Sequence, residues 1–563
     1  MTKPADVPTP KDPTRADQLS VAVIGAGAMG AGIAQVAAEA GHPVTLVDSQ
    51  PGAADTALER LVATYDTLVA KGRRTREEAD ATLARISTLT TADMRTLPPV
   101  GLVIEAVVEQ IDIKRAIFRQ LEEAQSPTTV LATNTSSLSI DAITGEATTG
   151  HDAALHGGRS PALTHPGRVL GLHFFNPPAL MKLVEVIAGS DSDPAILDDA
   201  CTLMQSWGKT PVRCTSTPGF IVNRVARPFY GEAQRMVAEG LADAATIDLA
   251  LRNAGFRMGP MELTDLIGQD VNYAVGESVW RQTGQDPRYA PTDYQHDLVR
   301  SGRLGRKSGQ GVFRYDESGT ALDAHPDEVL ATRLVGGPLR TDPVARTVAM
   351  LVNEGVDLVA RGEATAADVD TAMRLGTNYP KGPFEWLAEI GADTIRAQLA
   401  ELDAAYPGGR YRPSPALDTD DGSTEADLTH VTTMWEQDQA SAALGIEALE
   451  VGVDGASGLG FARTRMRVVE SMVNGHDILH GGYLFIFADS TFALACNASG
   501  RLTVAAAADI SFLTAGHLGD VLIAEARERV TYGRSGITDV TVMREDGEIV
   551  AEFRGRSRSL PPR

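Results

Sequence analysis

The stretch Val21–Gly30, VAVIGAGAMG, decides the fold of the first part of this 563-residue chain. A short apolar strand runs into Gly25-x-Gly27-x-x-Gly30, and a helix of small residues follows. In such a motif Gly25 permits the tight turn, Gly27 lets the backbone approach a pyrophosphate, and Gly30 allows the helix to pack closely on the strand. The N-terminus of the helix then faces the phosphates. This strand–turn–helix context predicts a dinucleotide site rather than a purely structural turn.

The next apolar run, HPVTLVD, ends in Asp48. A carboxylate at the end of the second strand accepts hydrogen bonds from both ribose hydroxyls and repels a 2′-phosphate, so we predict that the cofactor is NAD. Residues 102–108 (LVIEAVV) and 129–137 (TVLATNTSS) continue the alternation of short strands with helical stretches. Over residues 19–213 this alternation predicts a doubly wound parallel sheet of the Rossmann type, and hence an α/β fold.

The composition is that of a globular protein with an acidic surface, because 22% of the residues are charged and the net charge is −23. A surface of this sign argues against nucleic acid or an anionic membrane as the main partner. The longest apolar run, 482–498, contains Asp489 and is predicted to be a buried helix rather than a membrane span. The three cysteines form no CxxC pair, which suits a cytoplasmic protein without disulfides or a cysteine zinc site. Residues 1–18 are Pro-rich and charged, and we expect a disordered lead rather than a signal peptide.

From Thr217 onward a helical pattern takes over and contains an internal repeat. We place a helical substrate-binding and dimerisation unit at 214–320 and a second, structural helical repeat at 340–413. Two copies of one helical unit usually pack against each other as a pseudo-symmetric pair. At an offset of 122 residues, rising to 123 after one insertion, the sequence matches Glu232, Gly240, Asp248, Gly259, Pro260, Glu262 and Gly268 with Glu354, Gly362, Asp370, Gly382, Pro383, Glu385 and Gly391.

The last part of the chain follows a linker. Pro407–Thr424 is rich in Pro, Gly and Asp, and we place the linker at 414–428. Residues 429–563 combine one long apolar helix with alternating strands, which indicates an α+β domain. The strand candidates are 505–513, 521–530, 537–544 and 548–554.

Five motifs within residues 19–413 are specific enough to indicate a family. They are Glu105-Ala-Val-Val-Glu109, Asn134-Thr-Ser-Ser, Gly171-Leu-His-Phe-Phe-Asn-Pro177, Met181-Lys-Leu-Val-Glu185 and Thr217-Pro-Gly-Phe-Ile-Val-Asn-Arg224. In these motifs the chain resembles the 3-hydroxyacyl-CoA dehydrogenases. The resemblance implies NAD-dependent oxidation of (S)-3-hydroxyacyl-CoA to 3-oxoacyl-CoA. In shorter members the helical unit makes the dimer contact, so a tandem copy is expected to supply that face within one chain.

Oxidation of a secondary alcohol needs a group that removes the hydroxyl proton as the hydride leaves. A histidine suits this role, and a carboxylate partner fixes its tautomer and stabilises the imidazolium. His173 and Glu185 lie twelve residues apart on two predicted strands joined by a turn at Asn176-Pro177-Pro178, so they can lie side by side. The resemblance implies that His173 is the general base and Glu185 its partner.

The resemblance also implies further ligands of substrate and cofactor. It implies that Ser136 and Asn223 bind the substrate and the nicotinamide region. Lys71 matches a lysine that reaches the coenzyme A phosphates, although its place in the run KGRR equally suits a solvated lysine. The predicted cofactor contacts are Gly25, Gly27, Gly30, Asp48, Glu109, Lys114, Ser136, Asn176 and Lys307.

Residues 145–170 form a longer loop than the family pattern has at this place. The loop contains His151, His156 and His165, but their spacing is irregular and no cluster of acidic or cysteine ligands accompanies them. We predict a surface insertion near the substrate entrance and no metal site.

The C-terminal domain carries the motif Asn474-Gly-His-Asp-Ile-Leu-His-Gly-Gly482, followed by the apolar helix that contains Asp489. In these features it resembles the hot-dog thioesterases, most closely those of phenylacetate degradation. Backbone N–H groups at the helix start can polarise a thioester carbonyl, and a carboxylate inside an apolar helix is costly unless it is paired or functional. The resemblance implies that Asn474, His480, Gly481 and Asp489 form a thioesterase site.

The spacing within this helix bears on assembly. Gly481 and Asp489 are eight residues apart, which separates them by ~12 Å along one helix. A carbonyl polarised at Gly481 needs its nucleophile or base within ~3.5 Å, or one water away. Asp489 of a second chain meets this condition if two such helices pack around a two-fold axis. We therefore predict a homo-oligomer, at least a dimer, assembled through the hot-dog domain.

Two alternatives to a bifunctional acyl-CoA enzyme are open. The hot-dog domain could be a non-catalytic binding and oligomerisation module beside a dehydrogenase. A dehydrogenase of free hydroxy acids would share the glycine fingerprint but not the paired GLHFFNP and VE motifs. The fusion suggests a place in phenylacetate catabolism with 3-hydroxyadipyl-CoA as substrate, an inference by association rather than from the acyl pocket.

Overall fold

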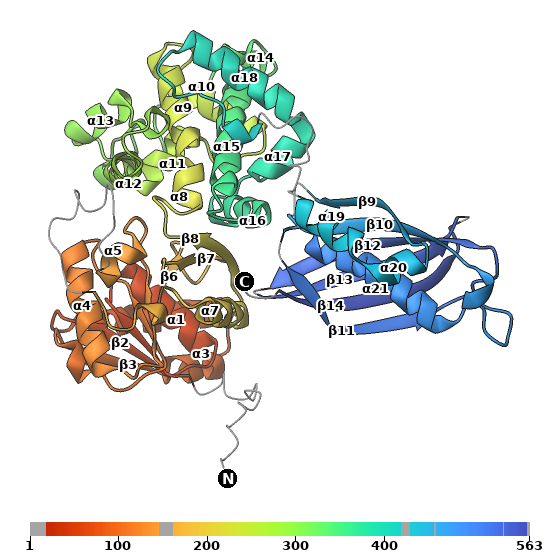
Figure 1. Ribbon diagram of the computed structural model, residues 1–563. Helices are drawn as coiled ribbons and strands as arrows, with labels where there is room; N and C mark the ends of the chain where they lie inside the picture. Colours follow the sequence, from red (N-terminus) through yellow and green to blue (C-terminus); the bar gives the residue numbers. More distant parts are fainter. Residues whose placement is uncertain are drawn as a thin grey trace. The chain divides into compact units, whose positions relative to one another are not determined.

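The computed structural model describes residues 19–145, 162–417, 428–454, 458–500, 502–532, 534–545 and 547–559. The predicted lead at 1–18, His151 and His156 of the long loop, and most of the predicted linker lie outside these residues. The chain divides into two compact units, one of Met1–Ala364 and Asp368–Ser414, the other of Thr365–Ala367 and Pro415–Arg563 (Figure 1). None of the helices in the described ranges combines the length and the apolar character needed to cross a bilayer.

The first unit begins with an eight-stranded sheet in the order β3-β2-β1-β4-β5-β6-β7-β8, in which all neighbours run parallel except β6 and β7. Its strands are β1 (Val21–Ile24), β2 (Val44–Asp48), β3 (Ile86–Thr90), β4 (Leu102–Glu105), β5 (Val130–Thr133), β6 (Val169–Phe174), β7 (Leu183–Ala188) and β8 (Thr210–Thr215). Its helices are α1 (Ala28–Glu39), α2 (Ala53–Ala70), α3 (Arg76–Leu83), α4 (Ile111–Ala124), α5 (Ile140–Thr144) and α7 (Pro194–Ser206). The strand order reverses between β1 and β4, and a sheet of this kind binds its ligand beyond the strand ends at that reversal.

Two glycines of the fingerprint are explained by close approaches at this reversal. Gly25 has φ +103°, and a Cβ there would lie 2.6 Å from the carbonyl oxygen of Ala106, which follows β4. A Cβ on Gly30 would lie 1.7 Å from the carbonyl oxygen of Gly25. Helix α1 can therefore pack this closely on the end of β1 only without side chains at these two positions. Apolar side chains of α1 and of β1, β2 and β4 form the core beneath.

The rest of the first unit is helical and contains two copies of one arrangement. Helices α13 (Asp293–Arg300) and α14 (Glu328–Leu334) lie between the copies in the sequence. Helices α11 and α12 match α17 and α18 at both ends at the offset of 123 residues. The first copy holds α8 (Val222–Val225), α9 (Arg227–Ala238), α10 (Ala244–Asn253), α11 (Pro260–Ile267) and α12 (Gln269–Gln282), and the second holds α15 (Pro343–Ala360), α16 (Ala366–Gly376), α17 (Pro383–Ile390) and α18 (Ala392–Ala405).

The repeated Asp and Gly-Pro residues have one structural role in both copies. The Asp248 carboxylate accepts hydrogen bonds from the first-turn N–H groups of Met261 and Glu262, at 2.9 Å each. Asp370 accepts from the corresponding N–H groups of α17, at 2.8 and 3.1 Å. A Cβ on Gly259 would lie 2.2 Å from the Asp248 carboxyl carbon, so the glycine makes room for this contact. Burial raises the pKa of Asp248 to about 7 despite the two N–H donors.

Two buried glutamates join the copies to each other. Glu232 on α9 accepts hydrogen bonds from Arg346, Arg410 and Tyr411, all of the second copy. Glu354 on α15 accepts hydrogen bonds from residues of the first copy. Each of these donors lies 122 residues before the corresponding donor to Glu232. These residues are Arg224, Arg288 and Tyr289. The predicted pseudo-symmetric pair is thus held together by a reciprocal set of buried ionic contacts.

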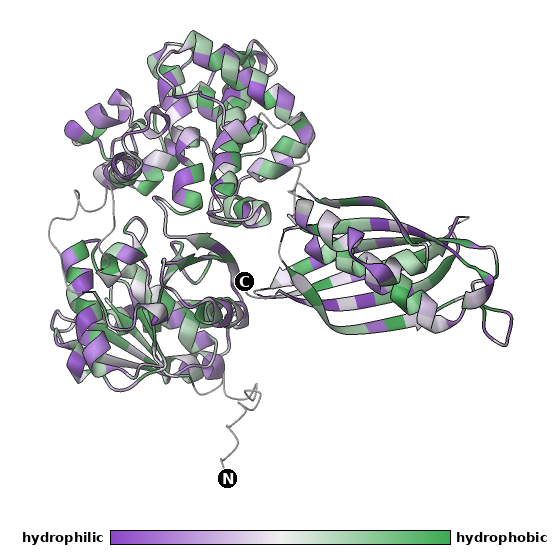
Figure 2. Ribbon diagram, viewed as in Figure 1, coloured by the Kyte–Doolittle hydropathy of each residue, from purple (hydrophilic) through white to green (hydrophobic). Residues whose placement is uncertain are grey.

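The second unit is an antiparallel six-stranded sheet, ordered β11-β14-β13-β12-β10-β9, with one long helix packed on it. Apolar residues on one face of the sheet and on α21 form its core, and Figure 2 shows hydrophilic and hydrophobic residues alternating along the strands. Its strands are β9 (Glu447–Val453), β10 (Gly460–Arg467), β11 (Thr503–Phe512), β12 (Val521–Tyr532), β13 (Ser535–Arg544) and β14 (Ile549–Ser559), and its helices are α19 (Thr429–Glu436), α20 (Gln439–Ala443) and α21 (Gly481–Asn497).

The predicted fold class is confirmed: a Rossmann-type sheet, two tandem all-helical units and an α+β hot-dog domain follow one another along the chain. The four predicted strands of the last domain correspond to β11–β14. Strands β9 and β10 were not among the candidates. In β10, Ala462, Thr464 and Met466 are buried while arginines alternate with them on the other face.

Candidate active sites

The glycine loop offers a fitting site for a dinucleotide. Helix α1 begins after Gly27, and no side chain caps its first N–H groups. These donors are therefore available to a pyrophosphate. A Cβ added at Gly27 would meet nothing within 4 Å, so the loop is open on this side. A bound phosphate group requires unpaired N–H donors at the start of a helix and space beside the backbone, and this loop offers both.

Asp48 lies beside this loop at the end of β2. One carboxylate oxygen accepts a hydrogen bond from the N–H of Ala26 at 2.8 Å, and the other accepts from Gln50 at 2.9 Å. The loop backbone thus holds the carboxylate in place next to the glycines. This placement suits a carboxylate that binds ribose hydroxyls.

The predicted base and its partner lie on neighbouring strands. β6 and β7 are antiparallel, and their register places His173 directly opposite Glu185. The Nδ1 atom of His173 lies 2.6 Å from Oε2 of Glu185, and both side chains are buried. A carboxylate at this distance holds a proton on Nδ1 and leaves Nε2 free to accept one. The pair therefore has the geometry of a general base with a fixed tautomer.

The second oxygen of Glu185 is held by a segment to which we assigned only Asn223. The N–H groups of Ile221 and Val222 donate to Oε1 at 3.1 and 2.9 Å. They are aimed by a turn in which Phe220 has φ +50°, an uncommon value for a residue other than glycine. The TPGFIVNR motif thus fixes the position of the Glu185 carboxylate through its backbone, a role that side-chain reasoning missed.

Asn223 and Ser136 meet across the boundary between the sheet and the helices. The amide of Asn223 donates to the carbonyl oxygen of Ser136 at 3.2 Å. The loop around Ser136 is in turn organised by Glu109, whose Oε1 accepts from the N–H groups of Ser136 and Ser137 at 2.9 and 3.0 Å and from the Thr135 hydroxyl at 2.6 Å. Burial alone would raise the pKa of Glu109, but Lys114 and these donors lower it. Glu109 is therefore a charged anchor for the loop that carries Ser136.

Lys114 does not reach the surface of the site. Its side chain is 0% exposed, and its ammonium lies 2.8 Å from Glu105 and 3.4 Å from Glu109. Glu105 is equally buried and also accepts from Thr133. In this arrangement Lys114 acts on the site through Glu109, and its predicted contact with NAD stays a prediction. Glu105, which we did not single out, completes the buried pair.

The remaining predicted ligands make no hydrogen bond to the catalytic pair among the described contacts. Asn176 is exposed on the loop after β6. Lys307 forms an ion pair of 2.6 Å with Asp270 on the first helical copy. Lys71 is exposed at the end of α2, and within the described ranges its ammonium pairs with no carboxylate. His165 is exposed, and the described residues contain no cluster of side chains suited to hold a metal ion.

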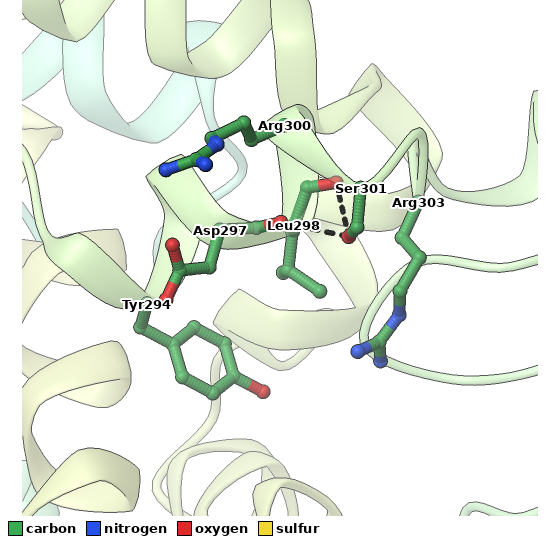
Figure 3. A pocket seen from close by; sticks show the side chains of 6 residues that line it. All are labelled: Tyr294, Asp297, Leu298, Arg300, Ser301 and Arg303. Atoms are coloured by element: carbon green, nitrogen blue, oxygen red, sulfur yellow. Dashed lines mark hydrogen bonds between the residues drawn. The ribbon is translucent and has the colours of Figure 1, made fainter.

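A cavity of about 470 Å³ on α13 involves none of the predicted residues. Figure 3 shows the guanidinium groups of Arg300 and Arg303 on opposite sides of Leu298, so they do not converge on one anion. Arg303 instead donates to the carbonyl oxygen of Gly311. The cavity is lined by Tyr294, Asp297, Leu298, Arg300, Ser301 and Arg303.

The predicted thioesterase residues gather at and along α21. Asn474 forms a turn before the helix, where its side chain accepts from the N–H of His476 at 2.8 Å. His480 caps the helix, and its Nδ1 accepts from the N–H of Gly482 at 3.0 Å. The N–H of Gly481 has no acceptor among the described residues, so it is the donor left for a substrate carbonyl. A Cβ at Gly481 would touch the ring of Phe512 at 3.0 Å.

Asp489 lies two turns further along the same helix. It is half-buried, and burial raises the pKa of its carboxyl. Within the described ranges no side chain or backbone group donates to this carboxylate. A buried carboxylate without a partner is costly, and such groups concentrate at functional sites.

Comparison with known proteins shows to which family this chain belongs. Residues 20–156 and 159–217 match the model of the 3-hydroxyacyl-CoA dehydrogenase NAD-binding domain, and residues 219–315 and 343–421 match the model of its C-terminal domain. A 3-hydroxyadipyl-CoA dehydrogenase of Escherichia coli strain K12 is 40% identical over 475 residues, which cover 71% of this chain and 96% of that protein. The chain belongs to the 3-hydroxyacyl-CoA dehydrogenase family. A crystal structure titled 3-hydroxybutyryl-CoA dehydrogenase from Escherichia coli K12 is 39% identical, covers 71% of this chain and 97% of its own, and has a TM-score of 0.61.

The predicted family and cofactor are therefore confirmed: this member of the 3-hydroxyacyl-CoA dehydrogenase family is an NAD-dependent enzyme. Two stretches match the C-terminal model, in agreement with the tandem helical copies. Residues 476–551 match the thioesterase superfamily, which confirms the class of the last domain. A structure of the Escherichia coli PaaI protein, titled as from the phenylacetic acid degradation operon, is 37% identical over 25% of this chain and 97% of its own, with a TM-score of 0.23.

Asp48 should set the preference of this dehydrogenase for NAD over NADP. We expect Asp48→Ala to narrow the ratio of the two kcat/KM values by about ten-fold or more, the scale of losing hydrogen bonds to a charged group. The substitution removes both the ribose contact and the repulsion of a 2′-phosphate. Asp55→Ala is the matched control, because Asp55 is exposed and bonds only to Thr88 among the described contacts. A wild-type enzyme that prefers NADP would contradict the assignment.

Proposed function

We propose that this chain is a bifunctional acyl-CoA enzyme. Its first unit oxidises (S)-3-hydroxyacyl-CoA to 3-oxoacyl-CoA with NAD, and its hot-dog domain hydrolyses an acyl-CoA thioester. The observation that carries the first activity is the buried His173–Glu185 pair, 2.6 Å apart, on strands of the sheet that bears the dinucleotide fingerprint.

In the oxidation, His173 accepts the hydroxyl proton on Nε2. Glu185 fixes the orientation of the ring and stabilises the imidazolium, and two backbone N–H groups hold its other oxygen in place. Bound NAD supplies the acceptor for the hydride. Asn223 and Ser136, which already contact each other, hold the reacting end of the substrate between the sheet and the helices.

The substrate that we propose for the dehydrogenase is 3-hydroxyadipyl-CoA, within a role in phenylacetate catabolism. The support is the name of the relative that is 40% identical over 96% of its length. A solved relative at similar identity is titled after 3-hydroxybutyryl-CoA, so a comparison of kcat/KM for the two substrates decides between them.

The support for hydrolysis is Asp489, a half-buried carboxylate with a raised pKa and no partner among the described residues. A raised pKa makes the ionised form a stronger base. The N–H of Gly481 is the free donor at the start of the same helix and polarises the thioester carbonyl. The two groups lie ~12 Å apart on one helix, so each site combines Gly481 of one chain with Asp489 of a second.

Assembly through the hot-dog domain is further supported by β11. This strand is an edge of the sheet, and its residues 504–507 are all exposed. Phe512 and Leu513 at its end are 55% and 56% exposed. An exposed edge strand with apolar side chains is a template for pairing with another chain. We propose that two chains pair along this domain.

A mixing experiment tests the shared site. Gly481→Pro deletes the N–H donor at the first position of α21, where helices tolerate proline. Gly481→Ala is its control, because it keeps the N–H and adds a comparable Cβ. We expect Gly481→Pro and Asp489→Ala each to lose thioester hydrolysis. Co-expressed, they should recover about one quarter of wild-type activity, since half of randomly formed two-fold dimers are mixed and each mixed dimer has one intact site.

The second candidate function is a dehydrogenase whose hot-dog domain only binds and oligomerises. Its prediction is a wild-type chain that forms NADH but releases no thiol from any acyl-CoA. Co-assembled variants that recover nothing, or a fully active monomer, would contradict the shared site while leaving the dehydrogenase untouched.

A further inference from the structure

The loop that follows the base is held at one point by a buried lysine. Residues 175–181 form the turn in the connection between β6, which carries His173, and β7, which carries Glu185. The carbonyl oxygen of Pro177 accepts hydrogen bonds from the N–H groups of Leu180 and Met181, both at 3.0 Å. The loop is therefore one tight turn, and its last carbonyl oxygens need partners outside it.

Lys209 supplies these partners. It lies just before β8 and is 8% exposed, and its ammonium donates to the carbonyl oxygens of Pro178 and Met181 at 2.5 and 2.9 Å. Among the described residues no carboxylate bonds to this ammonium. Both hydrogen bonds that this ammonium makes among the described residues therefore go to the loop.

The other side of the loop rests on the dinucleotide-binding helix. The ring of buried Pro178 lies against Gly32 of α1, where a Cβ would come within 2.8 Å of it. The turn is thus clamped between α1 and Lys209. It presents Asn176 to solvent and places the ring of Phe175 4.6 Å from the ring of His173.

We propose that Lys209 is a positioning residue for the oxidation, acting through the 175–181 turn on Asn176 and on the ring of His173. Without the ammonium, the buried carbonyl oxygen of Pro178 and the half-buried one of Met181 lose their donor and the turn relaxes away from α1. Asn176 then leaves its place beside the cofactor. The inference rests on the proposed dehydrogenase function and on the predicted contact of Asn176 with NAD.

Lys182 provides a matched control within the same region. Its ammonium donates to the carbonyl oxygen of Gly208 at 3.3 Å, but the side chain is exposed and, among the described contacts, makes no hydrogen bond to the turn. We expect Lys209→Gln to raise the KM for NAD by about ten-fold, the scale of leaving a buried acceptor unpaired, with the KM for hydroxyacyl-CoA within about two-fold of wild type. Lys182→Gln should leave both values unchanged.

The route through Asn176 is tested by a double variant. If Lys209 acts through the turn, Lys209→Gln combined with Asn176→Ala raises the KM for NAD no further than the larger single effect. Multiplied effects, or an Asn176→Ala variant with a normal KM for NAD, would overturn this route. A purely structural lysine would lower the melting temperature and leave the KM for NAD unchanged, which also overturns the proposal.

Two further outcomes are decisive. Should Lys209→Gln fail to fold, Lys209→Met takes its place, and failure of both shows that the lysine serves the fold rather than the site. A wild-type chain that oxidises no hydroxyacyl-CoA would instead refute the proposed function, independently of Lys209.

Discussion

Replacing His173 by alanine should lower the rate constant of hydroxyacyl-CoA oxidation by about 100-fold or more, the usual contribution of a general base. The substitution removes the Nε2 atom that accepts the hydroxyl proton, whereas the glycine loop and Asp48 are unaffected. The Kd of NAD should therefore stay within about two-fold of wild type. Single-turnover kinetics at saturating NAD measure the first quantity, and fluorescence titration measures the second.

His165→Ala is the control for this prediction. His165 is exposed, and it belongs to the long loop in which a metal site could be imagined. We expect wild-type turnover from it. Near-normal turnover of His173→Ala would remove His173 from the mechanism, and a large loss in His165→Ala would reopen the role of the loop.

Replacing Glu232 by alanine should lower the free energy of unfolding of the first unit by about 3–5 kcal/mol, the cost of breaking a buried ion pair. The change leaves the guanidinium group of Arg410 without its carboxylate and leaves the buried Arg346 paired with Glu239 alone. Glu354→Ala should cost a similar amount, because it occupies the equivalent place in the other helical copy. Calorimetry of the full chain reports the loss.

The matched control is Glu389→Ala. Glu389 pairs with Lys381 on the surface, where such pairs contribute at most about 1 kcal/mol. A loss from Glu232→Ala as small as that of the control would show that the copies are held by apolar packing instead.

The stability that Glu232 contributes depends on pH with a definite sign. Burial alone would raise the pKa of Glu232, but Arg410 and Arg346 lower it to about 2, so this contribution is present at neutral pH and fades only as the pH falls from 4.5 toward 2.

Local sequence relations made the fingerprint and the base predictable. Gly25 and Gly30 contact one another across a single turn, and His173 and Glu185 face each other across one short connection between strands. Such contacts follow from the spacing along the chain. The contact of Ile221 with Glu185 spans 36 residues, and that of Asn223 with Ser136 spans 87, so neither is fixed by local pattern.

The contacts between the helical copies could have been found from the repeat itself. Arg224 and Arg346 are 122 residues apart, as are Arg288 and Arg410. The most similar stretch of the two copies omits these arginines. Extending the offset of 122 residues upstream pairs Arg224 with Arg346, whereas the pairing of Arg288 with Arg410 requires a return from 123 to 122 after Gly391. The alternation of small or apolar residues with arginines was a further signal, and it indicated strand β10. It was obscured because arginine rarely occupies every second position of a strand.

Burial was harder to foresee than position. Lys114 follows a strand end that faces the cofactor site, and nothing in its neighbours indicates that Glu105 would hold it in the interior at 0% exposure. Lys209, by contrast, lies in an ordinary polar turn of the sequence, WGKTP. Its burial depends on carbonyl groups 28 and 31 residues away, which only the folded structure brings to it.

The most direct test of two chemistries in one chain measures NADH formation and thiol release side by side. The wild-type chain, His173→Ala and Asp489→Ala are each given a 3-hydroxyacyl-CoA with NAD and, separately, a panel of acyl-CoA esters. We expect the wild type to do both, His173→Ala to release thiol without forming NADH, and Asp489→Ala to form NADH without releasing thiol. Thiol release that is absent in the wild type, or that persists undiminished in Asp489→Ala, would contradict the second active site.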